Sequence, residues 1–244
     1  MTSNLRPAFY ALSVGSWRDY VTLLHPPYTI WHLSYVLLGA AAAPAVHPER
    51  VAGTVLAFFL GVGLAAHAFD EYKGRPLKTR IPDALLLGIA VFSLIGALAI
   101  GLVAIFTISL WTIPFVLFGE FAVLAYNLEL WKGRFHSDVW FGVAWGAFPA
   151  LTGYWANAGR LSIEAFLVAG ACLTLSLAQR VLSTRVRTLR RKARNAQGRI
   201  EYQDGSVENI DLGYLISPSE AALRLMTWSV GLLALGWLLG RFLG

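Results

Sequence analysis

Long apolar segments separated by short polar ones dominate the hydrophobic pattern of the chain. Each is close to the roughly 20 residues that an α-helix needs to cross the hydrocarbon core of a bilayer. The segments lie at about residues 28–46, 51–70, 83–105, 108–131, 139–157, 161–183 and 221–243. The pattern predicts an all-α bundle of about seven transmembrane helices.

Two polar stretches interrupt this pattern. Residues 1–27 alternate apolar and charged side chains at near-helical spacing, which predicts an amphipathic helix on the membrane surface that stops at Pro26. Residues 184–220 predict a basic helix, then a β-hairpin around the pair Asp204-Gly205. Ser217-Pro218-Ser219-Glu220 has the pattern of a capping box, with proline at the first helical position, and predicts the start of the last span. The expected parts are an interfacial segment (1–27), a six-helix membrane bundle (28–183), a cytoplasmic basic helix and hairpin (184–220) and a last transmembrane helix (221–244).

Composition supports a membrane protein. Hydrophobic residues make up 57% of the 244 residues and charged residues 14%, whereas soluble domains are about 45–50% apolar. Cys172 is the single cysteine, which excludes a disulfide or a cysteine metal site within one chain. We expect no cleavable signal peptide, because the first long apolar run lacks a small-residue cleavage site.

Lysine and arginine are distributed unevenly between the two sides of the predicted bundle. All but three of the 20 Lys and Arg residues fall on one side; the exceptions are Arg50, Arg160 and Arg241. Basic loops stay in the cytoplasm. The sequence therefore predicts a multi-pass protein of the plasma (inner) membrane with a cytoplasmic amino terminus.

The end of the second span carries the densest group of ionisable residues. His67, Asp70 and Glu71 stand at i, i+3 and i+4 and share one helical face. Ionisable groups in membrane helices are costly and by default indicate a functional site. We take all three as candidate catalytic residues, and Asp70 and Glu71 as candidate metal ligands. The alternative is an interfacial helix end with solvated polar groups.

Further residues are candidates for binding an anionic lipid substrate. Guanidinium groups match phosphate geometry, a mid-span carboxylate is costly unless it faces the bundle interior, and a tyrosine face can steady a cation. The candidates are Lys73, Arg75, Lys78, Arg80, Glu120, Tyr126, Asn127, Lys132 and Arg180. The alternatives are membrane topology and anionic-lipid attraction for the basic residues, a structural hydrogen bond for Glu120 and an interface role for Tyr126.

Several short motifs follow one another from the first to the fifth predicted span. Leu24-His-Pro-Pro-Tyr-Thr-Ile opens the first span, Ala66-His67-Ala68-Phe69-Asp70 ends the second, and Arg75-Pro76 follows. Ala125-Tyr126-Asn127, Trp131-Lys132-Gly133 and the run from Phe141 to Tyr154 come next. Over roughly residues 20–180 these features resemble the UbiA superfamily of intramembrane prenyltransferases, whose Asn-Asp-x-x-Asp motif matches the end of the second span.

The resemblance implies a prenyl diphosphate substrate and a Mg²⁺ cofactor, held by two Asp-rich motifs on cytoplasmic loops, and transfer of the prenyl chain to an acceptor. The sequence departs from this pattern. Ala66 and His67 replace the first two residues of the first motif, and residues 179–187, where the second motif belongs, contain no carboxylate. The chain also has about seven predicted spans where the family usually has nine.

We therefore expect a divergent UbiA-like protein that binds a polyprenyl or other lipid (di)phosphate and, if it is an enzyme, transfers the prenyl chain. In place of Mg²⁺, Arg180, Arg185 and Arg187 could neutralise the headgroup opposite the basic loop. The alternative function is a non-catalytic lipid-binding or scaffold subunit of a membrane complex. A transition-metal site that adds Glu129, His136 and Asp138 to the polar group is a weaker alternative. The expected partners are the bilayer, a lipid or prenyl (di)phosphate and a membrane protein, and not nucleic acid.

Overall fold

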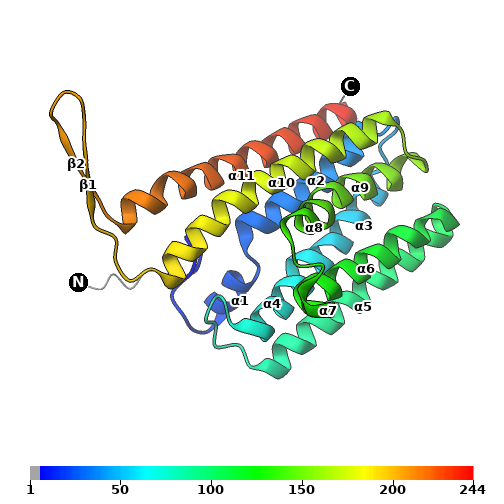
Figure 1. Cartoon of the computed structure of the whole chain (residues 1–244). Helices are drawn as coiled ribbons and strands as arrows, with labels where there is room; N and C mark the ends of the chain where they lie inside the picture. The colour runs from blue at the N-terminus through cyan, green and yellow to red at the C-terminus, as the bar shows by residue number, and fades with distance from the viewer. Residues whose placement is uncertain (1–5, 244) are drawn as a thin grey trace.

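Seven long helical units make up most of the bundle in the computed structural model, which describes residues 6–243 (Figure 1). The units are α2 (Pro26–Ala42), α3 with η1 and α4 (Pro48–Phe58, Phe59–Ala66, His67–Gly74), α5 (Asp83–Thr107), η2 with α6 (Leu110–Thr112, Ile113–Asn127), α8 with η3 and α9 (Asp138–Gly142, Val143–Ala147, Phe148–Ala158), α10 (Ile163–Lys192) and α11 (Leu212–Leu243). Two short helices, α1 (Trp17–Leu23) and α7 (Leu130–Gly133), lie in the connections.

Each predicted span overlaps one of these units, but the predicted spans 28–46, 108–131 and 161–183 extend a few residues past the observed helix ends. In the described part of the chain, five helices are long and apolar enough to cross a membrane: Pro48–Gly74, Asp83–Thr107, Leu110–Asn127, Ile163–Lys192 and Leu212–Leu243. The shorter α2 packs against α9 and α11, so it belongs to the same bundle. The predicted all-α membrane bundle is confirmed.

The predicted start of the last helix is wrong. α11 begins at Leu212, and Pro218 lies inside it instead of at its first position. Asp211 begins the helix, because its side-chain Oδ1 accepts a hydrogen bond of 2.7 Å from the backbone N–H of Tyr214. Proline removes only one helical hydrogen bond here, and packing of α11 against α2 and α10 keeps the helix continuous.

The amino-terminal segment is less helical than predicted. Its helix is limited to α1, and the described residues before α1 form turns; residues 1–5 lie outside the described residues. Pro26 begins α2, as proline does at a first helical position, and α1 has already ended at Leu23. Position on the membrane surface stays a prediction.

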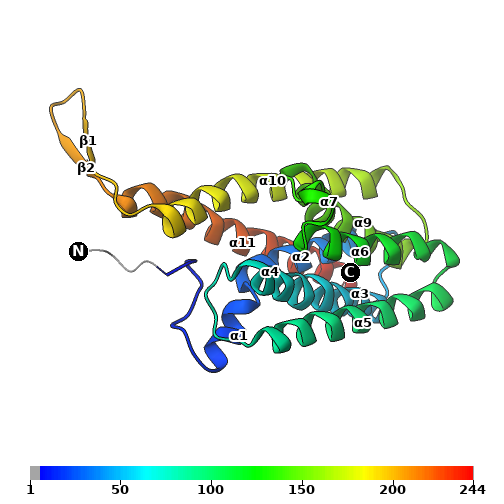
Figure 2. The ribbon, with the colours of Figure 1, turned by 60° about the horizontal axis from the view of Figure 1, so that its bottom comes forward.

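The predicted hairpin is confirmed. β1 (Gly198–Glu201) and β2 (Val207–Ile210) pair antiparallel. The turn has three residues between Tyr202 and Ser206 instead of the expected two, with Gly205 in the left-handed region at φ +82°. Figure 1 shows the hairpin projecting beyond the bundle, past the ends of α10 and α11 that it joins, and Figure 2 shows the same arrangement from a second direction.

Helices α2 and α9 touch through their backbones. A Cβ atom added to Gly39 would lie 1.9 Å from the carbonyl oxygen of Ala150, and one added to Gly153 would lie 2.2 Å from that of Val36. Small residues permit such close approach between membrane helices. This contact joins the first and fifth units and thereby sets the width of the bundle.

The backbone contact predicts a large effect of Gly153→Leu. We expect this variant to lose about 2 kcal/mol or more of stability, because α9 must move away from α2. Gly170→Leu on α10 is the control, since a Cβ there meets no atom within 4 Å. Thermal unfolding in detergent measures both, and equal melting temperatures for the two variants would contradict the proposed packing.

Candidate functional site

An apolar cavity of about 540 Å³ lies between α3, η1, α5, α6 and α9. Gly61, Val62, Ala122, Trp145 and Phe148 are among its lining residues. This volume lies within the usual range of small-molecule sites, about 300–1,000 Å³. Its walls suit a flexible hydrocarbon chain.

Two π-helical segments contribute to the cavity. η1 supplies Gly61 and Val62, and η3 supplies Trp145. π-helical turns are rare and occur frequently at functional sites. Glu120 also lines the cavity and is half-buried there, so its predicted place on the bundle interior agrees with the structure.

A second group of residues, which we call the polar corner, gathers around Asp70. Asp70 lies on α4 and is half-buried, and the charges of His136, Arg180, Arg187 and Arg191 act on it at close range. Among the described residues, Asp70 forms no side-chain hydrogen bond or ion pair. Its carboxylate is therefore available to a ligand.

One face of α10 supplies the basic side of the polar corner. Gln179, Ser183, Arg187 and Arg191 recur every four residues, a spacing that places them on one helical face. Gln179 and Ser183 are buried and the two arginines half-buried, whereas Arg185 is exposed. Arg185, which the sequence suggested for the headgroup, therefore lies outside the corner.

Aromatic rings close the corner on the side of α6. The ring of Tyr126 stacks on that of His136 with centroids 4.4 Å apart, and His136 Nδ1 lies 3.0 Å from the backbone carbonyl of Tyr126. The guanidinium of Arg180 lies 5.1 Å from the centroid of Phe141 and pairs with Asp138 at 2.8 Å. Arg180 is therefore held in place by residues of the α8 helix.

The amino-terminal segment closes the opposite side. Tyr10 Oη lies 2.9 Å from His25 Nδ1, and the imidazole of His25 stacks on that of His67 at 4.0 Å and 9°. Burial, then the neighbouring His67, Arg191 and Arg187, lowers the pKa of His25 well below its usual value. His25 is therefore neutral at pH 7, and if Tyr10 donates to Nδ1, Nε2 carries the proton.

Three buried polar atoms around the corner have no hydrogen-bond partner among the described residues. They are His25 Nε2, Tyr126 Oη and Gln179 Oε1. Tyr126 is only 5% exposed and Gln179 only 2% exposed. Buried polar atoms are normally paired, so this group indicates a place for a polar ligand.

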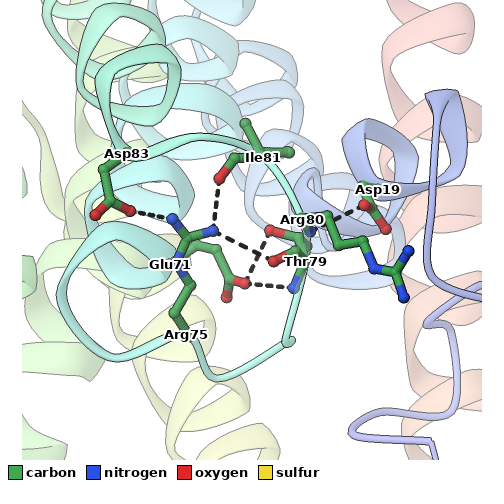
Figure 3. A network of polar contacts seen from close by, with 7 residues as sticks. All are labelled: Asp19, Glu71, Arg75, Thr79, Arg80, Ile81 and Asp83. Atoms are coloured by element: carbon green, nitrogen blue, oxygen red, sulfur yellow. Dashed lines mark hydrogen bonds and ion pairs between the residues drawn. The ribbon is translucent and has the colours of Figure 1, made fainter.

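Glu71 has a structural role. It is fully buried, and its carboxylate accepts hydrogen bonds from the Leu77 N–H at 2.9 Å, the Thr79 N–H at 2.8 Å and the Thr79 hydroxyl at 2.9 Å. Figure 3 shows the carboxylate enclosed by the loop after α4. We therefore do not retain Glu71 as a catalytic residue or metal ligand.

Arg75, the first basic residue of this loop, is held by contacts within the loop and with the start of α5. Arg75 donates to the carbonyls of Thr79 and Ile81 and pairs with Asp83. The Arg80 backbone N–H donates to Asp19 Oδ2 at 3.0 Å, while its guanidinium points away from the network (Figure 3). The loop is thus a scaffold that joins α4, α5 and α1, and we do not retain Arg75 as a headgroup ligand.

The other candidates lie at the edges of the site. Lys73, on α4, pairs with Glu129 at 2.7 Å and so ties α4 to the connection before α7. Lys78, Arg80 and Lys132 are exposed. Asn127 is buried, but its amide donates to Val123 on its own helix.

The residues present do not fit a Mg²⁺ site. Within residues 6–243, no group of three or more His, Cys, Asp or Glu side chains lies close enough to share a metal ion. Glu71 is saturated by the loop, and α10 presents an amide and guanidinium groups opposite Asp70. A hard cation needs several oxygen ligands, which this corner does not offer. The same finding argues against the transition-metal alternative.

Sequence reasoning missed several residues of the corner. Tyr10 and His25 are distant in sequence from Asp70, and only the folded amino-terminal segment brings them close. Gln179 and Arg191 could have been found from the four-residue spacing on α10. Of the earlier candidates, the corner retains His67, Asp70, Tyr126 and Arg180.

One curated relative is similar to this chain. The chain is 27% identical over 176 residues to protoheme IX farnesyltransferase of Parvibaculum lavamentivorans, across 66% of this chain and 54% of that enzyme. The chain thus spans about half the length of the relative that it matches. No family model matches the chain, and no solved structure matches it significantly.

Proposed function

We propose that this chain is a UbiA-like membrane protein that binds a polyprenyl or other long-chain lipid (di)phosphate. The tail occupies the apolar cavity and the headgroup the polar corner. One contact carries this proposal: Trp145 lines the cavity, and its ring meets that of Tyr126 in the corner at 5.6 Å and 81°. The two compartments are therefore neighbours, as an amphiphilic ligand requires.

Binding energy comes mainly from the tail. Each buried CH₂ group contributes about 0.8 kcal/mol, so a chain of several isoprene units gains many kcal/mol in the cavity. The corner supplies orientation, because its guanidinium groups hold the phosphate at one end. A free phosphate without a tail is expected to bind far more weakly.

We further propose prenyl transfer as the reaction, because the similar relative is a farnesyltransferase. An allylic cation leaving the headgroup would meet the rings of Tyr126 and Trp145, whose faces stabilise positive charge. Asp70 is the carboxylate at the centre of the corner. It would accept the proton that the attacking acceptor releases.

A second candidate function is a non-catalytic lipid-binding subunit of a membrane complex. The lack of a metal-ligand set favours it, because the usual means of activating a diphosphate is missing. Turnover of farnesyl diphosphate with a panel of acceptors separates the two candidates. Product formation supports the transferase, and stable binding without product supports the subunit.

We also propose the plasma membrane as the location, with the polar corner on the cytoplasmic side. The basic carboxyl-terminal part of α10 lies at the end of the bundle that carries the hairpin (Figures 1 and 2), and basic segments remain cytoplasmic. Cysteine labelling from either side of the membrane tests this orientation.

The cavity predicts a change in tail length for Gly61→Phe. A Cβ at Gly61 meets only Val123, at 3.9 Å, so the ring can enter the cavity without displacing the backbone. We expect the variant to co-purify with less lipid phosphate and with shorter tails than the wild type, as measured by mass spectrometry.

Gly88→Phe on α5 is the matched control, because nothing lies within 4 Å of a Cβ there. It should retain the wild-type lipid profile. An unchanged profile in Gly61→Phe would contradict the assignment of the tail to this cavity.

A further inference from the structure

We propose that the polar corner binds the phosphate group through arginine side chains of α10, without a divalent metal ion. The ligand class is a lipid phosphate monoester. This inference rests on the proposed function, and it replaces the acidic metal motifs with Arg187 and Arg191 as the principal ligands.

Arg187 and Arg191 differ from the other inward arginines of α10. Arg180 is paired with Asp138 at 2.8 Å, and Arg190 Nη2 with Glu220 at 2.9 Å. Within the described chain, Arg187 and Arg191 have no carboxylate partner; they donate only to the Thr184 hydroxyl at 3.2 Å and the Pro7 carbonyl at 3.4 Å. These two half-buried guanidinium groups therefore form no direct ion pair in the described structure.

Neutral polar groups around these arginines also lack hydrogen-bond partners in the described structure. Tyr126 Oη and Gln179 Oε1 are buried and unpartnered in the described structure, and Arg180 and Arg187 lie close enough to Tyr126 for their charges to act on it. A tyrosine hydroxyl and the NH₂ group of an amide can both donate hydrogen bonds to phosphate oxygens. His25 Nε2 is the third such atom.

Charge balance favours a monoester. Arg187 and Arg191 together carry about two positive charges, and a phosphate monoester carries about −1.5 to −2 at neutral pH. Arg180 and Arg190 already have their carboxylates. With Asp70 counted, the two arginines supply about one net positive charge, so the excess of negative charge is smaller for a monoester than for a diphosphate.

Arginine is suited to this task without help from a metal. Its planar guanidinium group binds phosphate oxygens bidentately and stays charged at any physiological pH. The four-residue spacing of Arg187 and Arg191 brings the two groups to one side of α10. A phosphate placed between them would also face Asp70, which accounts for the need for more than one arginine.

The test measures binding of farnesyl monophosphate and of phosphatidic acid to the full chain in detergent, with EDTA and with Mg²⁺. We expect EDTA to change the affinity by less than about twofold. Arg187→Gln and Arg191→Gln should each weaken binding about tenfold or more. Arg187→Lys should give an intermediate loss, because it keeps the charge and loses the bidentate geometry.

Arg185→Gln is the matched control, since Arg185 is exposed on the same helix and its loss changes net charge equally. It should bind as the wild type does. Binding that requires Mg²⁺, or equal losses in Arg185→Gln and Arg187→Gln, would overturn the arginine site while leaving the proposed function intact.

Two further outcomes separate the sources of the ligand. Tight binding of either lipid in EDTA supports the arginine site, and the tighter of the two identifies the tail. No binding of any lipid phosphate, with or without Mg²⁺, would instead overturn the proposed function itself. If an arginine variant does not fold, the comparison of EDTA with Mg²⁺ on the wild type still decides the question.

Discussion

Glu71→Gln is expected to lower the unfolding free energy by about 3 kcal/mol, the largest loss among single polar substitutions at this end of the bundle. Three donors of the loop converge on the two carboxylate oxygens. A glutamine replaces one oxygen with an NH₂ group, which places donor against donor in a fully buried position. Thermal and denaturant unfolding in detergent measure the loss.

Glu129→Gln is the control for this prediction. Glu129 is also a glutamate with a loop partner, but its side chain is 47% exposed and its pair with Lys73 lies at the surface. Exposed pairs contribute about 1 kcal/mol or less. If both variants unfold alike, Glu71 does not support the loop as the structure indicates.

Asp70→Asn is expected to separate binding from transfer. The charges of Arg187 and Arg191 act on its carboxylate, so in the proposed complex the carboxylate would lie near the headgroup and repel an anionic ligand in a site without metal. Two unit charges some 4–8 Å apart interact by roughly 2–4 kcal/mol at an effective dielectric constant of about 20. We expect at least tenfold tighter binding of farnesyl monophosphate, together with loss of any prenyl transfer, since Asp70 is the carboxylate proposed to accept the proton.

A metal-dependent site predicts the reverse. If Asp70 held Mg²⁺ on the headgroup, Asp70→Asn would weaken binding, and the loss would appear only with Mg²⁺ present. Asp83→Asn serves as the control, because Asp83 is exposed and pairs with Arg75 in the loop. It is expected to leave lipid affinity unchanged.

The positions of the membrane helices were accessible from hydropathy alone. Apolar runs near 20 residues and the Asp204-Gly205 turn signal depend on local sequence; in the described part of the chain, five of the seven runs lie in helices long and apolar enough to cross a membrane, and the hairpin is confirmed with a turn one residue longer than expected. The early start of α11 could not be predicted from the sequence pattern. It depends on an Asp211 cap and on packing that carries the helix through Pro218.

The site was predictable only in outline. Helical spacing correctly grouped His67 with Asp70, but it also grouped Glu71 with them. Its hydrogen bonds come from Leu77 and Thr79, and the fold of their loop is not visible in a periodic pattern. Charge alone could not distinguish Arg75, which pairs with Asp83 in the loop after α4, from Arg191, which lies in the polar corner.

The residues that replace the acidic motifs of the UbiA superfamily lie in the same corner of the structure. His67 occupies the place of an aspartate and stacks on His25 instead of approaching a metal. On α10, Gln179 and the arginines occupy the place of the second motif. Both changes remove negative charge from the same corner, so they favour direct binding of a phosphate.

The most direct test of the central claim is an experimental structure of the chain with farnesyl monophosphate in EDTA. The account predicts the phosphate within hydrogen-bonding distance of the guanidinium groups of Arg187 and Arg191, with the prenyl tail passing Trp145 into the cavity beside Gly61. A phosphate bound elsewhere, or a tail lying outside that cavity, would contradict it.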